Sequence, residues 1–377
     1  MFLKSLILTG SIQGFFLILL LKSKSRNSNS DQLLMAWLAI VSFQLLFYYD
    51  NLSPNPIAPT YVQLLGFPLP LISSPILYLY VFSFNSQFGW AKKWLHLMPY
   101  LLFCLLSFYF FFINSTNITF SYALPRFGIE VPFWVSIFLP ILLAIIPGFY
   151  ALLSLQTLIK YQKLLPENYS FTEKINLNWL KWIVISLLIL FIFLFPLIKY
   201  GIILGFVTQQ NLFSVVGSTL SFYVFFIGFF GLRQTTIFTD IPVITNVENI
   251  VDAKPSYQNS GLNDEAVNEL FKKLVHHMQE NKPYLDENLN LISLAQQLNL
   301  TSNQLSQIIN QKTSSNFFNF INSYRVEAVK KKLKDATYAH YSILAIGYDC
   351  GFQSKSSFNK VFKQMTGKTP LEFQKSS

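Results

Sequence analysis

The sequence predicts an all-α chain in two parts, a polytopic transmembrane helical domain followed by a soluble domain of short helices. Of its 377 residues, 52% are hydrophobic and only 12% are charged, whereas roughly 25% of the residues of a soluble protein carry a charge. The long apolar runs lie in residues 1–240, which hold 13 Lys and Arg, whereas residues 241–377 hold 15 in a much shorter stretch. We therefore expect a transmembrane domain over 1–233, a linker over 234–262, a connector helix over 263–283 and a soluble domain over 284–377.

Seven segments of the first part are long and apolar enough for membrane spans, because a spanning helix needs roughly 20 mostly apolar residues. They cover residues 3–21, 33–49, 61–84, 95–113, 133–158, 179–199 and 211–232. With the N-terminus outside, the cytoplasmic side holds ten Lys and Arg and the outer side three. Because cytoplasmic loops carry the excess of Lys and Arg, we expect a multi-pass protein of the inner (cytoplasmic) membrane with its C-terminal domain in the cytoplasm.

The apolar segments carry no ionisable residue at mid-membrane depth, where a proton or ion pathway would require one. A transporter or channel with an auxiliary cytoplasmic domain is therefore the alternative interpretation rather than the first. A membrane enzyme ranks lower, since the sequence contains no paired carboxylates, no phosphate loop and no Ser/His/Asp cluster. We expect no catalytic residue, no metal and no cofactor, and we expect Cys104 and Cys350 to be core residues.

The connector has apolar residues at helical spacing, with acidic residues in its first turn, where they suit the helix dipole. These apolar residues are Val267, Leu270, Phe271, Leu274 and Met278. The stripe predicts a helix that either packs on the domain that follows or pairs two protomers.

Residues 289–311 have the pattern of a helix, a tight turn and a second helix. Asn299 tolerates the left-handed backbone of a turn, and Thr301 with Gln304 has the spacing of a capping box. The second helix, residues 302–311, is expected to bury Leu305, Ile308 and Ile309. It is expected to expose Ser302, Asn303, Ser306, Gln307 and Asn310, whose amides and hydroxyls suit hydrogen bonds to base edges in a major groove.

The same pattern returns about 50 residues later, after a long helix predicted over residues 316–334. Ser342 is expected to cap a short helix, Gly351 to supply the turn, and residues 354–365 to form a second polar-faced helix. Two such units on one stiff helix can place their recognition helices about 34 Å apart, in successive major grooves. Residues 284–377 hold 11 Lys and Arg against 6 Asp and Glu, which suits contact with phosphates.

The region from Tyr284 to Gln374 resembles the DNA-binding domain of the AraC/XylS family of transcription regulators. The resemblance covers about a quarter of the chain. It is carried by Leu294-Ala295 through Leu305-Ser306, Tyr324-Arg325 with Ala328, Ile343 to Ile346, Gly351-Phe352, Ser357-Phe358 to Phe362-Lys363, and Gly367 to Pro370. It implies a homeodomain-like pair of helix-turn-helix motifs, and the whole layout is similar to bacterial regulators that fuse this domain to a multi-helix membrane sensor.

By this resemblance, base-reading positions fall on Asn303, Ser306, Gln307, Lys355, Ser356, Asn359 and Lys360. We expect phosphate contacts from Thr301, Lys312, Lys332, Ser342 and Lys363. The family often has Arg where this chain has Gln307 and Lys360, and Gln favours adenine over guanine while Lys lacks the planar fork of Arg. The family usually has Ala near Gly347, so we expect the short helix there to be weakened, by about 1 kcal/mol.

The resemblance therefore implies a membrane-anchored regulator that couples a signal at the membrane to promoter binding. Its expected partners are double-stranded promoter DNA, the lipid bilayer, a second copy of the chain and an unidentified membrane or extracytoplasmic ligand.

Overall fold

The computed structural model describes residues 2–24, 27–53, 56–84, 93–113, 118–121, 124–127, 133–173, 175–201, 204–233 and 263–376. The chain divides into two compact units. The first unit comprises residues 1–159 and 177–245, and the second comprises residues 160–176 and 246–377. The linker expected over residues 234–262 lies outside the described residues.

The first unit is a bundle of helices, and each of the seven predicted apolar segments is helical over most of its length. The helices are α1 (Phe2–Lys22), α2 (Asn29–Asn51), α3 (Thr60–Gly66), α4 (Pro70–Phe82), α5 (Met98–Ile113), α6 (Phe133–Asn168), α7 (Asn178–Pro196) and α8 (Gln209–Arg233). A 3₁₀ turn over Lys93–Leu97 precedes α5, and a π turn over Leu197–Gly201 follows α7. Among the described residues, five helical segments are long and apolar enough to cross a membrane, and two shorter apolar helices accompany them.

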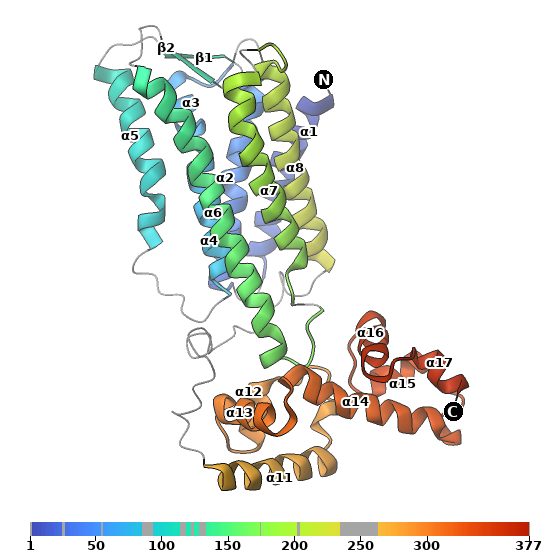
Figure 1. Ribbon diagram of the computed structural model, residues 1–377. Helices are drawn as coiled ribbons and strands as arrows, with labels where there is room; N and C mark the ends of the chain where they lie inside the picture. Colours follow the sequence, from blue (N-terminus) through green and yellow to red (C-terminus); the bar gives the residue numbers. More distant parts are fainter. Residues whose placement is uncertain are drawn as a thin grey trace. The chain divides into compact units, whose positions relative to one another are not determined.

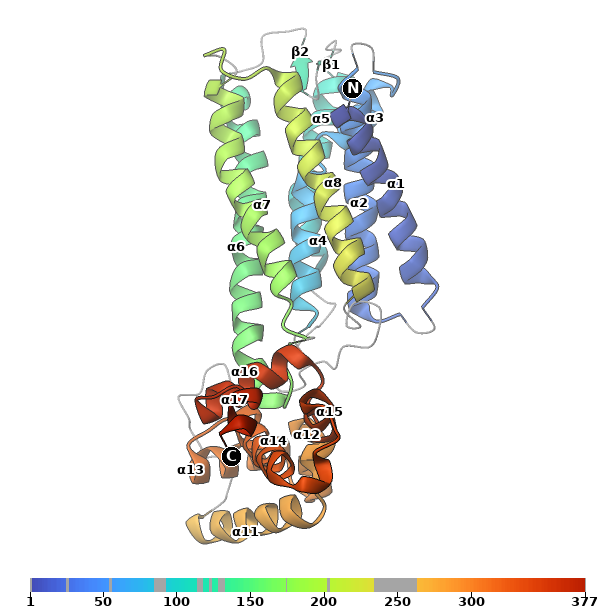
Figure 2. The same ribbon diagram turned by 90° about the vertical axis from the view of Figure 1, so that its right-hand side faces the viewer.

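Small residues let α1 approach both α2 and α8 closely, and the three helices lie side by side (Figure 2). A Cβ added at Gly10 would overlap Ser221 of α8, and one added at Gly14 would overlap Ser42 of α2. Helices of apolar segments associate through such small residues, because close backbone approach maximises van der Waals contact.

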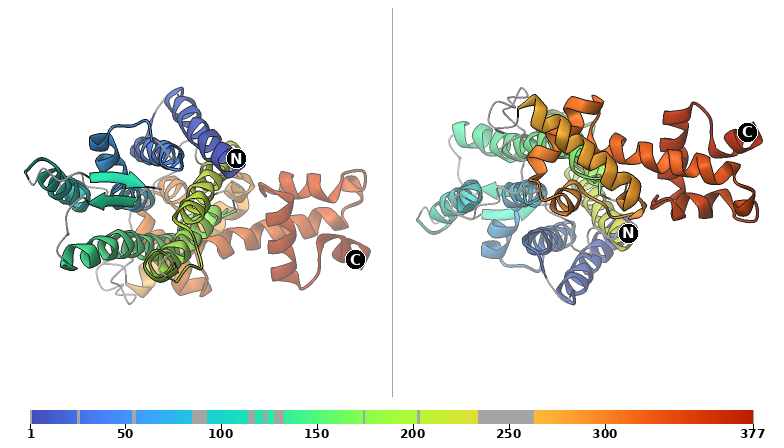
Figure 3. Two further views of the ribbon diagram at one scale, coloured as in Figure 1. Left: turned by 90° about the horizontal axis from the view of Figure 1, so that it is seen from above. Right: turned by 90° about the horizontal axis from the view of Figure 1, so that it is seen from below.

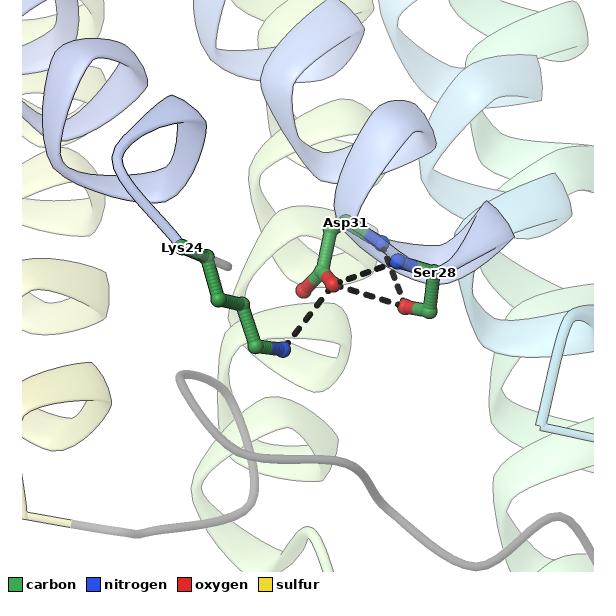
Figure 4. A network of polar contacts seen from close by, with 3 residues as sticks. All are labelled: Lys24, Ser28 and Asp31. Carbon is green, nitrogen blue, oxygen red and sulfur yellow. Dashed lines mark hydrogen bonds and ion pairs between the residues drawn. The ribbon is translucent and has the colours of Figure 1, made fainter. Parts of the chain in front are cut away.

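The start of α2 is fixed by polar contacts around one carboxylate (Figure 4). Ser28 and Asp31 form a reciprocal capping box at the start of α2. Lys24 pairs with the same carboxylate at 2.9 Å, and both side chains are largely buried. These contacts provide hydrogen-bond partners at the start of α2, and they also neutralise the charge of Asp31.

Two features of the first unit differ from the sequence-based expectation. The third apolar segment is broken between α3 and α4, because Pro68 and Pro70 cannot donate the amide hydrogen bonds of a continuous helix. An antiparallel hairpin of β1 (Ile118–Ser121) and β2 (Leu124–Phe127) pairs Ile118 with Phe127. The predicted all-α fold class is confirmed, because the described residues are almost entirely helical apart from this hairpin. The hairpin itself was not predicted, since strands this short carry too few residues for an alternating pattern.

Helix α6 is longer than predicted. The sequence predicts an end near residue 158, but the helix has 36 residues and continues to Asn168. At 1.5 Å per residue it measures about 54 Å, against a hydrocarbon thickness of roughly 30 Å. Its last turns, from Lys160, belong to the second unit. They therefore join the predicted transmembrane part to the C-terminal part.

The second unit contains short helices around two cores. They are α11 (Asp264–Glu280), α12 (Leu291–Gln297), α13 (Ser302–Thr313), α14 (Phe317–Lys334), α15 (Ile343–Asp349), α16 (Lys355–Thr366) and α17 (Pro370–Lys375), with 3₁₀ turns over Pro283–Leu285 and Ala336–Tyr338. Helix α14 runs from the first core, among α11 to α13, to the second core, among α15 to α17 (Figures 1 and 3). Helix α17 was not predicted, although Thr369, Pro370 and Glu372 form a helix-start pattern.

The connector helix packs on the domain that follows it. In α11, Val267, Leu274 and Met278 are buried in the first core together with residues of α12, α13 and α14. These side chains are therefore not free to pair with a second protomer. Of the two interpretations of the apolar stripe, the structure supports packing on the domain that follows.

Candidate nucleic-acid interface

The first helix-turn-helix motif consists of α12 and α13. Asn299 adopts a left-handed φ of +57° in the turn, as its residue type predicts. Thr301 caps α13: its hydroxyl accepts the Gln304 amide at 3.2 Å, and the Gln304 side chain accepts the Thr301 amide at 3.0 Å. The predicted capping box is thereby confirmed, and it fixes where the polar face of α13 begins.

The predicted base-reading residues of α13 do not share one environment. Asn303 is exposed and Ser306 is half-buried. Gln307, which we expected to point into solvent, is only 3% exposed. Its Oε1 has no hydrogen-bond partner among the described residues. The expectation of an exposed Gln307 is therefore wrong for this arrangement of the chain.

Helix α14 carries a buried arginine that ties the two motifs together. Arg325 is 1% exposed, and its guanidinium donates to the carbonyl oxygens of Tyr284 and Asp286, both at 2.8 Å. Burial lowers the pKa of Arg325 to about 10, while Asp286 and Glu287 act in the opposite direction. The side chain therefore stays charged at neutral pH and holds the start of the first motif against the linking helix.

The second motif consists of α15 and α16, with Gly351 in the turn between them. Gly351 has a φ of +88°, and a Cβ there would overlap the Tyr284 carbonyl oxygen. Two reasons therefore require glycine at this position: the left-handed backbone conformation and the close contact with Tyr284. Ser342 caps α15, and Ser354 caps α16 by accepting the Ser357 amide at 3.0 Å.

The remaining predicted base-reading residues gather on α16. Lys355, Ser356 and Lys360 are exposed, and Asn359 is half-buried. The opposite face of α16 buries Phe358, Val361 and Phe362 in the second core. The helix therefore presents amide, hydroxyl and ammonium groups on one side, which suits contacts with bases and phosphates.

Four of the five predicted phosphate contacts are exposed: Thr301, Lys312, Ser342 and Lys363. Lys332 is different. Its ammonium group is paired with Asp349 and lies 5.0 Å from the centre of the Tyr338 ring. It is therefore already engaged within the second motif.

Sequence reasoning missed three residues that contact this surface, Glu167, Ser170 and Glu173. All three come from residues 160–176, far from the motifs in the chain. No motif or periodicity marks them, since two acidic residues and a serine before an apolar helix are ordinary in a loop.

The comparisons with known proteins agree with the two motifs. A family model described as a helix-turn-helix domain matches residues 294–376. Three curated proteins of Staphylococcus aureus, from strains COL, MSSA476 and N315, are named uncharacterized HTH-type transcriptional regulators and are each 29% identical over 113 residues. That stretch covers 30% of this chain and 14% of each relative. No solved structure matches. The C-terminal part is thus a helix-turn-helix domain of the kind found in transcription regulators.

Proposed function

We propose that the chain is a membrane-anchored, sequence-specific DNA-binding transcription regulator, in which a signal at the membrane controls promoter binding by an AraC-type domain. The observation that carries the proposal is the pair of N-capped polar helices, α13 and α16. Each is supported by its own hydrophobic core, and α14 joins the two cores. This arrangement suits the reading of two successive major grooves.

The proposed division of labour follows the chemistry of the side chains. Asn303, Ser306 and Gln307 of α13 and Lys355, Ser356, Asn359 and Lys360 of α16 read base edges. Thr301, Lys312, Ser342 and Lys363 contact phosphates, which fix the register of the protein on the duplex. The excess of 11 Lys and Arg over 6 Asp and Glu in residues 284–377 supports this sequence-independent part of the affinity.

The membrane anchor is supported by the five described segments that are long and apolar enough to cross a bilayer. Seven spans, with α5 and α7 as the two shorter helices, make up the proposed anchor. The distribution of Lys and Arg supports an outer N-terminus and a cytoplasmic C-terminus, which is the arrangement that brings the domain to chromosomal DNA. A second copy of the chain on a repeated half-site and an unidentified ligand of the membrane part complete the proposal.

Genomic occupancy of the full chain, mapped by crosslinking and sequencing, tests the proposed function. We expect a small number of occupied promoter regions and a chain that stays in the membrane fraction after alkaline washing. Substituting Asn303 and Asn359 by Ala together should abolish the occupancy without changing the membrane fractionation. A chain that occupies no region above background would contradict the regulator, whereas a chain released by alkaline washing would contradict only the anchor.

A further inference from the structure

Residues 160–176, the connecting segment, comprise the last turns of α6 and the loop that follows, and they fold with the DNA-binding unit. Tyr169 forms an antiparallel bridge with Asn290, the N-cap of α12. Ser170 donates its hydroxyl to the Leu289 carbonyl at 2.6 Å. The connecting segment is therefore seated on the edge of the first helix-turn-helix motif by backbone and side-chain bonds.

The carbonyl of Ser170 is held by the linking helix α14. Arg325 Nη1 donates to this oxygen at 3.1 Å and Asn322 Nδ2 at 3.2 Å, while Arg325 Nη2 reaches the Ser170 hydroxyl at 3.0 Å. Arg325, Asn322 and Ser170 are all buried. Charge-assisted bonds from a buried guanidinium are among the stronger polar contacts in proteins. The connecting segment is thus bound at the junction of the two motifs.

Three residues further on, Glu173 caps the second recognition helix. The Ser354 hydroxyl donates to its carboxylate, and Ser356 and the backbone of Ser357 bond to it as well. Partial burial raises the pKa of Glu173, but these bonds and the attraction of Lys360 outweigh it, so the pKa lies below its usual value. A carboxylate therefore occupies the N-terminus of α16, on Ser356 and beside Lys360, two of the side chains proposed to read base edges.

The connecting segment also reaches the first recognition helix, because Glu167 is hydrogen-bonded to Asn310 of α13. Gln307 lies one turn before Asn310, nearly opposite the core residues of α13 on a helix that turns about 100° per residue. Its own core therefore does not account for its burial, and the Glu167–Asn310 bond places the end of α6 beside this part of α13. No described residue bonds to Gln307 Oε1 in this arrangement. A base edge in DNA would supply the missing partner.

We propose that the connecting segment is an intramolecular competitor of DNA, in which Glu173 occupies the base-reading start of α16 and the end of α6 covers Gln307 on α13. The inference rests on the proposed function, since it concerns the same surface. Glu173 and a base edge cannot both occupy the start of α16, and the carboxylate also repels the phosphates of the duplex. DNA binding therefore requires the connecting segment to leave.

The connection of this segment to α6 and α7 provides a way for the membrane part to control DNA binding. The connecting segment is continuous with α6 at one end and with α7 at the other, and both helices belong to the first unit over most of their length. A change in the relative position of α6 and α7 is passed on to Ser170 and Glu173, because only nine residues separate the two helices. The device needs no second protein to transmit the signal.

DNA affinity of the full chain in lipid nanodiscs tests the competitor. The probe is a duplex from the genomic region most strongly occupied by the full chain, and binding is measured by fluorescence anisotropy. We expect Glu173→Gln to tighten binding about tenfold, the size expected for loss of a hydrogen-bonded carboxylate, and Ser170→Ala to tighten it severalfold. Glu280→Gln is the matched control, since it removes the same charge from the exposed end of α11, and it should change affinity less than twofold.

A second readout does not depend on DNA affinity. A zero-length carbodiimide joins a carboxylate to an amine that can reach it, and Lys360 lies near enough to attract Glu173. The DNA-free chain should therefore yield a Glu173–Lys360 crosslink by mass spectrometry, and saturating duplex should abolish it. Equal affinities of Glu173→Gln and Glu280→Gln for DNA, or a crosslink that persists on DNA, would overturn the proposal that the connecting segment competes with DNA. Neither result would contradict the proposed regulatory function. Absence of binding by wild type and all variants would instead contradict the proposed function, and the competitor with it.

Discussion

The ring of Phe358 lies directly against the backbone of Gly347, so that a Cβ added there would come within 2.9 Å of the ring carbon Cδ1. Gly347 belongs to α15 and Phe358 to α16, and both residues are buried. The glycine is therefore not simply a weak point of α15, as its helix propensity suggests, but the position that lets the second recognition helix pack closely.

Gly347→Ala should accordingly destabilise the domain. Overpacking costs about 1–3 kcal/mol, whereas the gain in helix propensity is only about 1 kcal/mol, so we expect a net loss of about 1 kcal/mol in urea unfolding of residues 263–377. In a Phe358→Leu background the same substitution should be neutral or stabilising, since the ring that causes the overlap is gone. A stabilising Gly347→Ala in the unaltered domain would mean that Phe358 can move aside without cost.

Arg325 should be the most sensitive polar residue of the domain. Arg325→Met keeps the length of the side chain but leaves the Tyr284 and Asp286 carbonyls without their donor. An unsatisfied buried polar group costs about 1–3 kcal/mol, so we expect a loss of about 3 kcal/mol in urea unfolding. Lys331→Met, on the exposed side of the same helix, is the control and should change stability by less than about 0.5 kcal/mol.

Cys350 makes the stability of the domain depend on pH in the alkaline range. Burial raises the pKa of its thiol from 9.0 to about 11, partly opposed by Lys332. The folded state therefore favours the protonated thiol, so this contribution to stability is complete below pH 9 and is lost as the pH rises through 11. In residues 263–377, where Cys350 is the only cysteine, Cys350→Ala should weaken the fall in stability over this range. Alkylation of the native thiol at pH 8 should be no faster than unfolding.

The helices of the second unit could be predicted because each carries its own signals. Periodicity marked the buried faces of α13 and α16, and Thr301, Ser342 and Gly351 marked where helices begin or turn. These signals lie within a few residues of the element they define. The apolar segments of the first unit were equally visible, because length and hydrophobicity suffice to recognise them.

Contacts between distant parts of the chain could not be predicted in this way. Arg325 and Ser170 are 155 residues apart, and neither residue type indicates the other. The proposed cover of Gln307 requires α6 to continue past its apolar stretch to Asn168, which a hydropathy pattern does not reveal. The close packing at Gly347 likewise follows from the angle between two helices, which is a tertiary property.

Gln307 should specify one base of the binding site. A bidentate amide contact is worth about 1–3 kcal/mol of discrimination against the wrong base, so Gln307→Ala should lose that preference at a single position and leave the others intact. Selection of random duplexes with the variant and the wild type measures this directly. Gln311→Ala, near the end of the same helix and exposed, is the control and should leave every position unchanged. An unaltered base preference in Gln307→Ala would show that the residue stays covered in the complex.

Lys332 and Lys363 should contribute differently to the salt dependence of DNA binding. Each phosphate contact by a lysine steepens the slope of log affinity against log salt by about 0.9. Lys363 is exposed on α16, so Lys363→Ala should flatten the slope by about one. Lys332 is neutralised by Asp349, so Lys332→Ala should change the slope by less than half as much, although the sequence alone predicts an equal effect. Titrations between about 50 and 200 mM salt separate the two. If both variants flatten the slope equally, Lys332 must exchange Asp349 for a phosphate on binding, and Asp349→Asn should then tighten binding at every sequence.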